Sequence, residues 1–521
     1  MSAHSEAASD NSNISSLHDQ ALAAYRAGRH DTVHALAAQI LTLDGEHTGA
    51  MHLEGLLALA TGQPEVARHW LERAIQLGPE ANLYNTLYAI QLRLGDHDGA
   101  VDSLRKGLAL QPEFTALHYN LALTLQHLDR PEDAAVSYRR TIKIEPGHSA
   151  AHNNLGRIFA DLGALQEAEH HYRRALELAP ANLVARNNLS MLLLATGRYQ
   201  EAWPYFEDRW VSFRHADGSP ARVPIQAPLP RWWGESPAVV GAAEPKRMRS
   251  ERLLVLDEQG YGDSLQFVRY LPMALERFAQ VGYVCPAPLR RLYEESLCSR
   301  WPGLVLLDEP ASDFASWDRY CPLMSLPMAF GTQVATIPAD TPYLHADTTR
   351  AAAWRARLDA LPDAHLPRIG VVWAGGHSGI AVDRRRSLSA AQLAPLFALD
   401  QIRWISLQKT DDPAKLADPA SQARLTDWTA DLTDFADTAA LIANLDLVIS
   451  VDTSVAHLAA ALGKPVWLLN RFAGCWRWLR GRDDSPWYPG LRLFTQTQRD
   501  DWDDVLARTC EALKQRYAIG A

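Results

Sequence analysis

The chain reads NLALTLQHLDRPEDAAVSYRRTIKIEP at residues 120–146 and NLGRIFADLGALQEAEHHYRRALELAP at residues 154–180. Both stretches start with Asn-Leu and end with proline, and they lie 34 residues apart. Other positions keep the same step: Ala100, Ala134, Ala168 and Ala202; Gly163 and Gly197; Tyr138, Tyr172 and Phe206. Because several independent positions share one period, the first part of the chain is an internal repeat.

A period of 34 residues, with small residues at helix contacts and proline after the second helix, is typical of the tetratricopeptide repeat (TPR). Each unit is a helix–turn–helix that buries its apolar face only by stacking on its neighbours, which gives a helical solenoid with a groove. We predict about six units over residues 16–213, after a disordered tail at 1–15. Residues 214–250, rich in proline and tryptophan, should form a linker strap.

After residue 250 the pattern changes to short apolar runs separated by helical stretches. Such alternation predicts parallel sheets with crossover helices. A break near Pro362–Pro367 divides this region into two expected Rossmann-like lobes, at 251–362 and 363–521, with ligands at the carboxyl ends of the strands. The apolar runs lie at 253–257, 282–285, 304–308, 369–374, 403–407, 446–451 and 465–469.

Composition restricts the class of protein. The formal net charge is −10 and the pI is about 6.0, which argues against nucleic-acid binding because that needs a basic face. The 5 cysteines show no metal-binding or pairing pattern, which suits a reducing compartment. No signal peptide and no transmembrane run is visible. We therefore expect a cytoplasmic location.

One glycine-rich turn follows the first apolar run, in LVLDEQGYGDSLQFVRYLP (254–272). Gly260 and Gly262 make the turn tight, and Asp263 opens a helix, so its carboxylate should point into the cleft. The simpler interpretation is that Asp263 only complements the helix dipole.

A second turn lies in DLVISVDTSVAHLAAALGKPVWLLN (446–470). Free backbone N–H groups at a helix start bind phosphate, and the hydroxyls of Thr453 and Ser454 would add donors. Asp452 would accept hydrogen bonds from sugar hydroxyls. An ordinary helix cap by Asp452 or Thr453, with His457 packed on the helix, is the alternative.

A third stretch, WAGGHSGIAVDRRRSLSAAQL (373–393), places three arginines after a glycine-rich loop. Arginine is the preferred partner of a diphosphate because its guanidinium binds two oxygens at once. The alternative for Arg384, Arg385 and Arg386 is a solvated surface run.

Together these motifs resemble the bacterial TPR-linked branch of the heptosyltransferase-like glycosyltransferases (GT9-like), which are inverting GT-B enzymes. The layout is also similar to that of the eukaryotic O-linked N-acetylglucosamine transferase. The resemblance implies that Asp263 is the general base and that Gly260 and Gly262 lie at the acceptor site. It further implies that these residues bind the nucleotide-sugar donor: Arg384, Arg386, Gln408, Lys409, Asp452, Thr453, Ser454 and His457. The loop RFAGCWRW (471–478) departs from the family pattern.

We expect no metal and no other cofactor, because arginines and a helix start can stabilise the departing diphosphate. Asp501–Trp502–Asp503 has the spacing of a metal-binding motif, but it opens the last helix and is better interpreted as a cap.

The Asn-Leu pairs suggest that Asn120, Asn154 and Asn188 bind the backbone of a protein acceptor in the TPR groove, since an amide both donates and accepts. The acceptor would be a flagellin or another surface-structure subunit. Asparagine at this position also has a purely structural explanation. A noncatalytic scaffold, a glycan acceptor and a homo-oligomer all stay open.

Overall fold

The computed structural model describes residues 2–212, 227–234, 249–308, 314–376, 385–410 and 417–519. The chain divides into two compact units. One contains Met1–Phe159 with Gln166–Asn182, and the other contains Ala160–Leu165 with Leu183–Ala521. None of the described helices is both long and apolar enough to cross a lipid bilayer.

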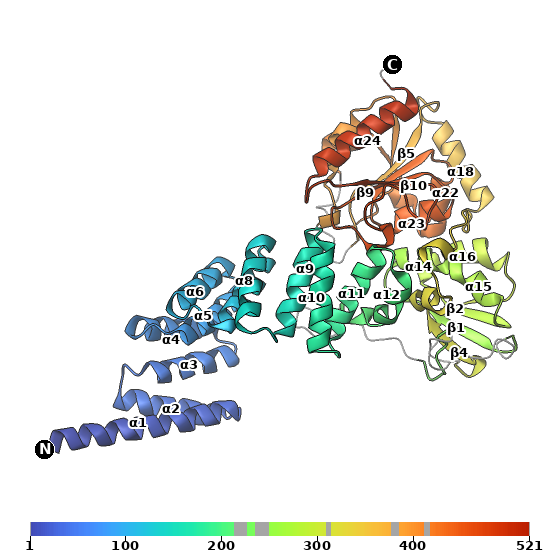
Figure 1. The fold of residues 1–521 in the computed structure, drawn as a ribbon. Helices are drawn as coiled ribbons and strands as arrows, with labels where there is room; N and C mark the ends of the chain where they lie inside the picture. The colour runs from blue at the N-terminus through green and yellow to red at the C-terminus, as the bar shows by residue number, and fades with distance from the viewer. Residues whose placement is uncertain are drawn as a thin grey trace. The chain divides into compact units, whose positions relative to one another are not determined.

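The repeat region is entirely helical, and its helices follow one another as pairs (Figure 1). The alanines that keep the 34-residue step at 100, 134, 168 and 202 are fully buried, which lets neighbouring helices approach closely. The helices are α1 Ser2–Arg26, α2 His30–Leu43, α3 Thr48–Ala60, α4 Pro64–Leu77, α5 Ala81–Arg93, α6 His97–Leu110, α7 Thr115–His127, α8 Pro131–Ile144, α9 Ser149–Asp161, α10 Leu165–Leu178, α11 Leu183–Ala195 and α12 Tyr199–Phe206.

Each pair turns through one residue with a left-handed backbone, which explains why glycine recurs there. The φ angles are 68° at Gly28, 77° at Gly62, 74° at Gly95, 80° at Gly163 and 79° at Gly197. Asp129 takes this position in the fourth pair with a φ of 56°; aspartate tolerates the left-handed region better than most residues do.

The disordered tail expected at residues 1–15 is corrected, because α1 starts at Ser2. The stretch from Ser2 to Arg26 contains neither proline nor glycine. Once its buried end is helical, extending the helix costs less than starting a new one.

The first sheet has four parallel strands in the order β3-β2-β1-β4. Its interior is apolar, since Leu253, Leu254 and Val255 of β1 are fully buried. The strands are β1 Arg252–Leu256, β2 Gln280–Val284, β3 Leu304–Leu307 and β4 Arg319–Pro322, and the helices include α14 Tyr261–Phe267, α15 Leu271–Leu275 and α16 Ala287–Tyr293.

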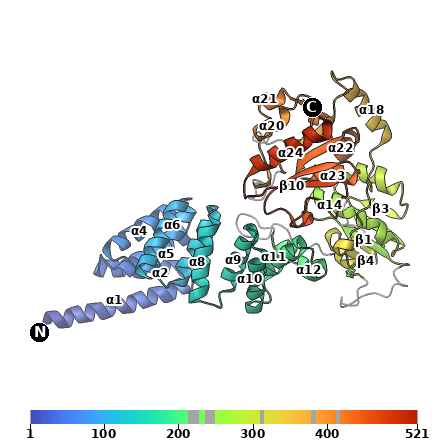
Figure 2. The ribbon, with the colours of Figure 1, turned by 45° about the horizontal axis from the view of Figure 1, so that its top comes forward.

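The second sheet has six parallel strands in the order β10-β9-β8-β5-β6-β7. The last helix, α24, lies beside this sheet (Figure 2). Its Leu506 and Leu513 join an apolar core with Phe397 and Trp404. The strands are β5 Arg368–Val372, β6 Arg403–Ser406, β7 Leu425–Asp427, β8 Leu447–Val451, β9 Val466–Asn470 and β10 Leu491–Thr495. The helices include α18 Thr348–Asp359, α20 Ala394–Phe397, α22 Phe435–Ile442, α23 Ser454–Ala461 and α24 Trp502–Tyr517.

The parallel sheets with intervening helices confirm the expected α/β character of this region. Sequence patterns did not identify β4, β7 and β10, which carry polar or charged residues. The predicted cap is confirmed, because the Asp501 carboxylate accepts a hydrogen bond from the Asp504 amide, 3.1 Å away.

A buried ion pair joins the end of the repeats to the four-stranded sheet. Arg209, after α12, donates to both carboxylate oxygens of Glu258, at 2.9 and 2.6 Å, and both side chains are at most 1% exposed. Most of the strap expected at 214–250 lies outside the described residues. Within it, Trp232 is buried and its amide donates to the carbonyl of Tyr320 in β4, 2.8 Å away.

Candidate functional site

The order in which successive strands join the six-stranded sheet reverses between the parallel neighbours β5 and β8. Strands β6 and β7 extend from β5 on one side, while β8, β9 and β10 extend on the other. In parallel sheets such a switch point leaves a crevice beyond the carboxyl ends of the two strands, where ligands bind. The segment after β5 contains Gly375 and Arg386, and the segment after β8 begins with Asp452.

Arg386 bridges the two segments at this switch point. Its Nη1 donates to the backbone carbonyl of Asp452, 2.8 Å away. A Cβ at Gly375 would lie 2.5 Å from the Arg386 Nε, so only glycine leaves room for the guanidinium there. Arg384 lies outside the described residues, and Arg385 lies in a separate pocket.

The turn after β8 presents the start of α23 to the crevice. Thr453 precedes the helix in an extended conformation, and its side chain does not cap the helix amides. Its hydroxyl lies 2.9 Å from the Ser450 hydroxyl instead. The first amides of α23, beginning at Ser454, are therefore not satisfied by the expected side-chain cap, which leaves them suited to an anion.

His457 is a buried part of this turn. Its Nδ1 lies 2.9 Å from the Tyr488 hydroxyl, and its ring stacks on Trp478 with centroids 5.2 Å apart. Burial, followed by the nearby positive charge of Arg477, lowers the pKa of His457 well below its ordinary value. The imidazole is therefore neutral at pH 7, and its Nε2 lies 4.0 Å from the Asp452 carboxylate.

The turn that contains Gly262 and Asp263 meets the turn that contains Asp452, because α14 packs against α23. A Cβ on Gly262 would lie 3.1 Å from the His457 ring and 3.5 Å from the Ser454 Cα. Gly262 thus permits the close approach of the two helix starts. The second unit therefore brings Asp263 and the Asp452 turn to one site.

Asp263 makes two contacts, which bear on the two interpretations of its role given from the sequence. Its Oδ2 accepts a hydrogen bond from the Gly260 amide, 3.0 Å away, so it does cap the start of α14. Its Oδ1 accepts a hydrogen bond from Arg477, and the Asp263 side chain is 18% exposed. Asp263 therefore caps α14 and binds Arg477 at the same time.

Arg477 was missed by sequence reasoning. It lies in the loop 471–478, and the departure of this loop from the family pattern was the one sign in the sequence that the loop has a special role. Its Nε donates to the Gln266 Oε1, 2.6 Å away. Burial alone lowers the pKa of Arg477, but the Asp263 carboxylate outweighs that effect and the net change is upward. Arg477 is therefore a permanent buried cation beside Asp263.

Asp257 is a second missed carboxyl, directly after β1. The Tyr283 hydroxyl donates to its Oδ1 at 2.5 Å, and the Ser264 hydroxyl lies 2.5 Å from the Tyr283 hydroxyl. Burial raises the pKa of Asp257 to about 7. A carboxyl group with a pKa near neutrality is suited to proton transfer.

Gln408 and Lys409 bind the protein's own backbone. The Gln408 Oε1 accepts hydrogen bonds from the amides of Trp373 and Ala374, at 3.1 and 2.9 Å. The Lys409 ammonium donates to the carbonyl of Leu432. Both side chains thus shape the end of the β5–β6 pair, and their expected contacts with a nucleotide stay a prediction.

The asparagines of the repeats are linked to neighbouring side chains. The Asn120 Nδ2 donates to the Asn85 Oδ1 at 2.8 Å, one repeat earlier. The Asn154 Nδ2 lies 3.2 Å from the Tyr138 hydroxyl and 3.3 Å from the Tyr119 hydroxyl. Asn188 lies in α11 of the second unit.

Comparison with protein families identifies two parts of the chain. Residues 18–82, 90–147, 119–182 and 166–220 match the tetratricopeptide repeat. Residues 423–469, which include β8 and the Asp452 turn, match glycosyltransferase family 9 (heptosyltransferase). The chain therefore combines TPR repeats with a segment similar to that glycosyltransferase family.

Single proteins are also similar to parts of the chain. Protein FlbA of Caulobacter vibrioides is 28% identical over 312 residues, which cover 56% of this chain and 49% of FlbA. The chain thus spans about half the length of this curated relative. The crystal structure of MamA is 22% identical with a TM-score of 0.29, covering 32% of this chain and 92% of MamA. YrrB, described as a TPR protein with an unusual peptide-binding site, is 18% identical with a TM-score of 0.29, covering 32% and 88%.

Proposed function

We propose that the chain is an inverting, metal-independent glycosyltransferase of the GT-B type, with its two parallel sheets as the two Rossmann-like lobes. It moves a sugar from a nucleotide-sugar to an acceptor, which is a protein recruited by the TPR groove. The overall plan would then be similar to that of the O-linked N-acetylglucosamine transferase. The observation that carries the proposal is the meeting of the Asp263 turn with the Asp452 turn at the switch point of the six-stranded sheet.

The donor would bind in the β5–β8 crevice. Arg386 is held at the crevice by the Asp452 carbonyl, where its guanidinium can face a diphosphate. The first amides of α23 and the hydroxyls of Thr453 and Ser454 supply further donors. Because these groups are fixed before the reaction, they stabilise the charge that develops on the departing diphosphate.

The acceptor hydroxyl would attack from the side of α14. Its oxygen forms the new bond to the anomeric carbon while the bond from that carbon to the diphosphate oxygen breaks. The hydroxyl proton passes to the Asp263 carboxylate, and the nucleoside diphosphate leaves as an anion. One displacement of this kind inverts the anomeric configuration.

The acceptor would be a flagellin or another surface-structure subunit, held through Asn120, Asn154 and Asn188. Two other functions are the alternatives. A transferase acting on a glycan would use the repeats to bind an assembly partner. A noncatalytic scaffold would keep the fold without the reaction, but the presence of Asp263 and Asp452 in one site favours catalysis.

A thermal-shift screen tests the proposal. UDP-, GDP-, ADP- and CMP-sugars are added one at a time, because a ligand that binds only the folded protein raises its stability by RT ln(1 + [L]/Kd). One nucleotide class should raise the melting temperature, and an Asp452→Ala variant should respond less. No shift with any sugar nucleotide would favour the scaffold.

A further inference from the structure

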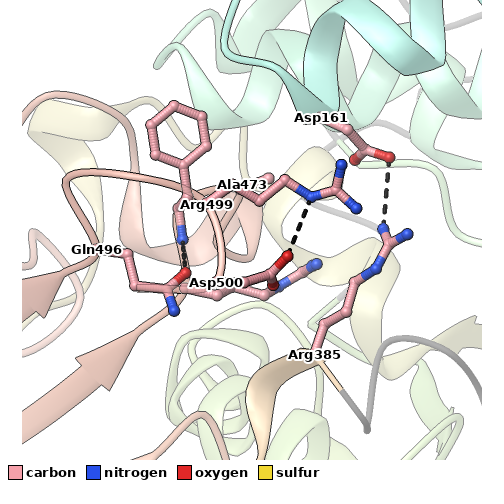
Figure 3. A pocket seen from close by; sticks show the side chains of 8 residues that line it. Asp161, Arg385, Ala473, Gln496, Arg499 and Asp500 are labelled. Atoms are coloured by element: carbon pink, nitrogen blue, oxygen red, sulfur yellow. Dashed lines mark hydrogen bonds and ion pairs between the residues drawn. The ribbon is translucent and has the colours of Figure 1, made fainter. Parts of the chain in front are cut away.

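A basic pocket lies on the same edge of the six-stranded sheet as the crevice, beyond β9 and β10. Its walls come from the segments after these two strands, from Arg385 and from Asp161 (Figure 3). Its cavity volume is about 20 Å³. Sites for organic ligands usually measure about 300–1,000 Å³, so this pocket suits a small ionic group.

Positive charge exceeds negative charge around this pocket. Two arginines have carboxylates beside them: Arg385 lies 3.6 Å from Asp161, and Arg499 lies 3.5 Å from Asp500. Arg471, which also lines the pocket, makes no hydrogen bond or ion pair with any residue in the described part of the chain. Its charge is therefore unpaired among the described residues.

A fourth arginine, Arg480, lies behind the wall of the pocket and adds to this positive charge. The Nη1 of Arg480 donates to the carbonyl of Phe472, which lies next to Arg471 in the pocket wall. Burial, followed by the charge of Arg471, lowers the pKa of Arg480. Three guanidinium groups and two carboxylates thus line the pocket, and a fourth guanidinium lies behind its wall. Counted over the described residues alone, the excess is two positive charges.

The unsatisfied polar atoms at the pocket are hydrogen-bond donors. Gln496 is only 3% exposed. Its Oε1 accepts from the Phe472 amide at 2.9 Å, but its Nε2 has no partner among the described residues. The buried Arg480 Nε also has no hydrogen-bond partner among the described residues. A buried donor without an acceptor destabilises the fold, so a ligand that accepts hydrogen bonds suits this pocket.

We propose that this pocket binds a phosphoryl group, with Arg471 and the Gln496 amide as its main donors. Two excess positive charges match a phosphate, which carries about −1.5 to −2 at pH 7. Asp161 and Asp500 do not oppose this ligand strongly, because Arg385 and Arg499 already neutralise them. The ligand would be inorganic phosphate or the terminal phosphate of a nucleotide, and either would hold the turn at 160–165 against the segments after β9 and β10. The proposal does not depend on sugar transfer.

Isothermal titration of the full-length protein tests it at constant ionic strength. Inorganic phosphate and nucleoside diphosphates are titrated separately into the wild type, Arg471→Gln and Gln496→Glu. The first variant removes the unpaired charge, and the second keeps the oxygen that holds Phe472 but replaces the free donor with an acceptor. Each should weaken binding at least about tenfold, which corresponds to about 1.4 kcal/mol. Arg355→Gln, at an exposed arginine of α18, is the matched control and should bind like the wild type.

The two titrations distinguish the sources of the phosphoryl group. Loss of inorganic phosphate binding in both variants, but not in the control, supports a site for free phosphate. If only nucleoside diphosphates bind the wild type, and both variants weaken them, the occupant is the nucleotide's terminal phosphate. Equal binding of every ligand by the wild type and both variants overturns the proposal, as does the absence of any binding. Circular dichroism confirms that each variant is folded.

Discussion

Arg477 donates a hydrogen bond to the carboxylate of Asp263, across the boundary between the six-stranded and the four-stranded sheet. The two residues are 214 positions apart. The same arginine binds Gln266, one turn further along α14. Arg477 therefore holds the first turn of α14 toward the switch point. Under the proposed function, the residue that accepts the proton is also the residue that joins the two lobes.

Replacement of Asp263 by asparagine should slow transfer strongly. The amide keeps the size of the side chain but cannot accept the acceptor's proton. Because general-base catalysis contributes about 10²–10⁴-fold, single-turnover rates at saturating donor should fall by about that factor while donor affinity hardly changes. The same measurement on Asp257→Asn is the comparison. A normal rate for Asp263→Asn together with a strong loss for Asp257→Asn would transfer the role of base to Asp257.

Replacement of Arg386 or Asp452 by alanine should weaken donor binding without unfolding the protein. A hydrogen bond to a charged group is worth about 1.5–3 kcal/mol, so the donor's Kd should rise roughly tenfold to a hundredfold. Titration of the nucleotide-sugar found in the thermal-shift screen measures this, with Arg355→Ala as the control. Equal affinity in all four proteins would remove the β5–β8 crevice as the donor site.

The asparagines of the repeats should act on the protein acceptor alone. Asn120→Ala with Asn154→Ala removes two amides from the array, each worth about 0.5–1.5 kcal/mol as a neutral hydrogen-bonding group. The KM for the protein acceptor should rise, by roughly two- to tenfold per residue, while hydrolysis of the donor stays unchanged. Asn82→Ala, at an exposed position of α5, is the control. An unchanged KM would leave these asparagines with a structural role only.

The buried pair of Arg209 and Glu258 should be essential for stability. Both side chains are at most 1% exposed, and removing one partner leaves the other as an uncompensated buried charge. Arg209→Met should therefore lower the free energy of unfolding by about 3–5 kcal/mol. Arg277→Met, at an exposed pair with Glu276, should cost less than about 1 kcal/mol. Chemical denaturation compares the two variants, and similar losses would contradict this account.

The sequence predicts the repeats and the two turns well because both depend on local chemistry. A glycine every 34 residues marks a left-handed turn, and an apolar run before Gly-Tyr-Gly-Asp marks a strand that enters a helix. The contact of Asp263 with Arg477 has no such local signal, since it depends on how two sheets pack. The same limit applies to Gln408: its position after a strand predicts a ligand contact, but the hydrogen bonds that its Oε1 accepts from the Trp373 and Ala374 amides have no local signal in the sequence.

Asp257 should make the stability of the protein depend on pH. Burial raises its pKa to about 7 in the folded state, compared with about 3.9 in an unfolded chain. The folded protein thus binds more protons than the unfolded one between these two values. The resulting stabilisation is complete below the unfolded pKa and is lost as the pH rises through about 7.

Asp257→Asn removes this loss because asparagine does not titrate. Its free energy of unfolding should therefore rise relative to the wild type between about pH 4 and 7, by at most about 1.4 kcal/mol per pH unit, and then level off. Urea denaturation across this range measures the difference. Asp400→Asn, at an exposed carboxylate, should run parallel to the wild type. The difference in free energy of unfolding between Asp257→Asn and the wild type could instead stay constant with pH. Asp257 would then be ionised in the folded protein throughout this range, and it would not exchange protons near neutrality.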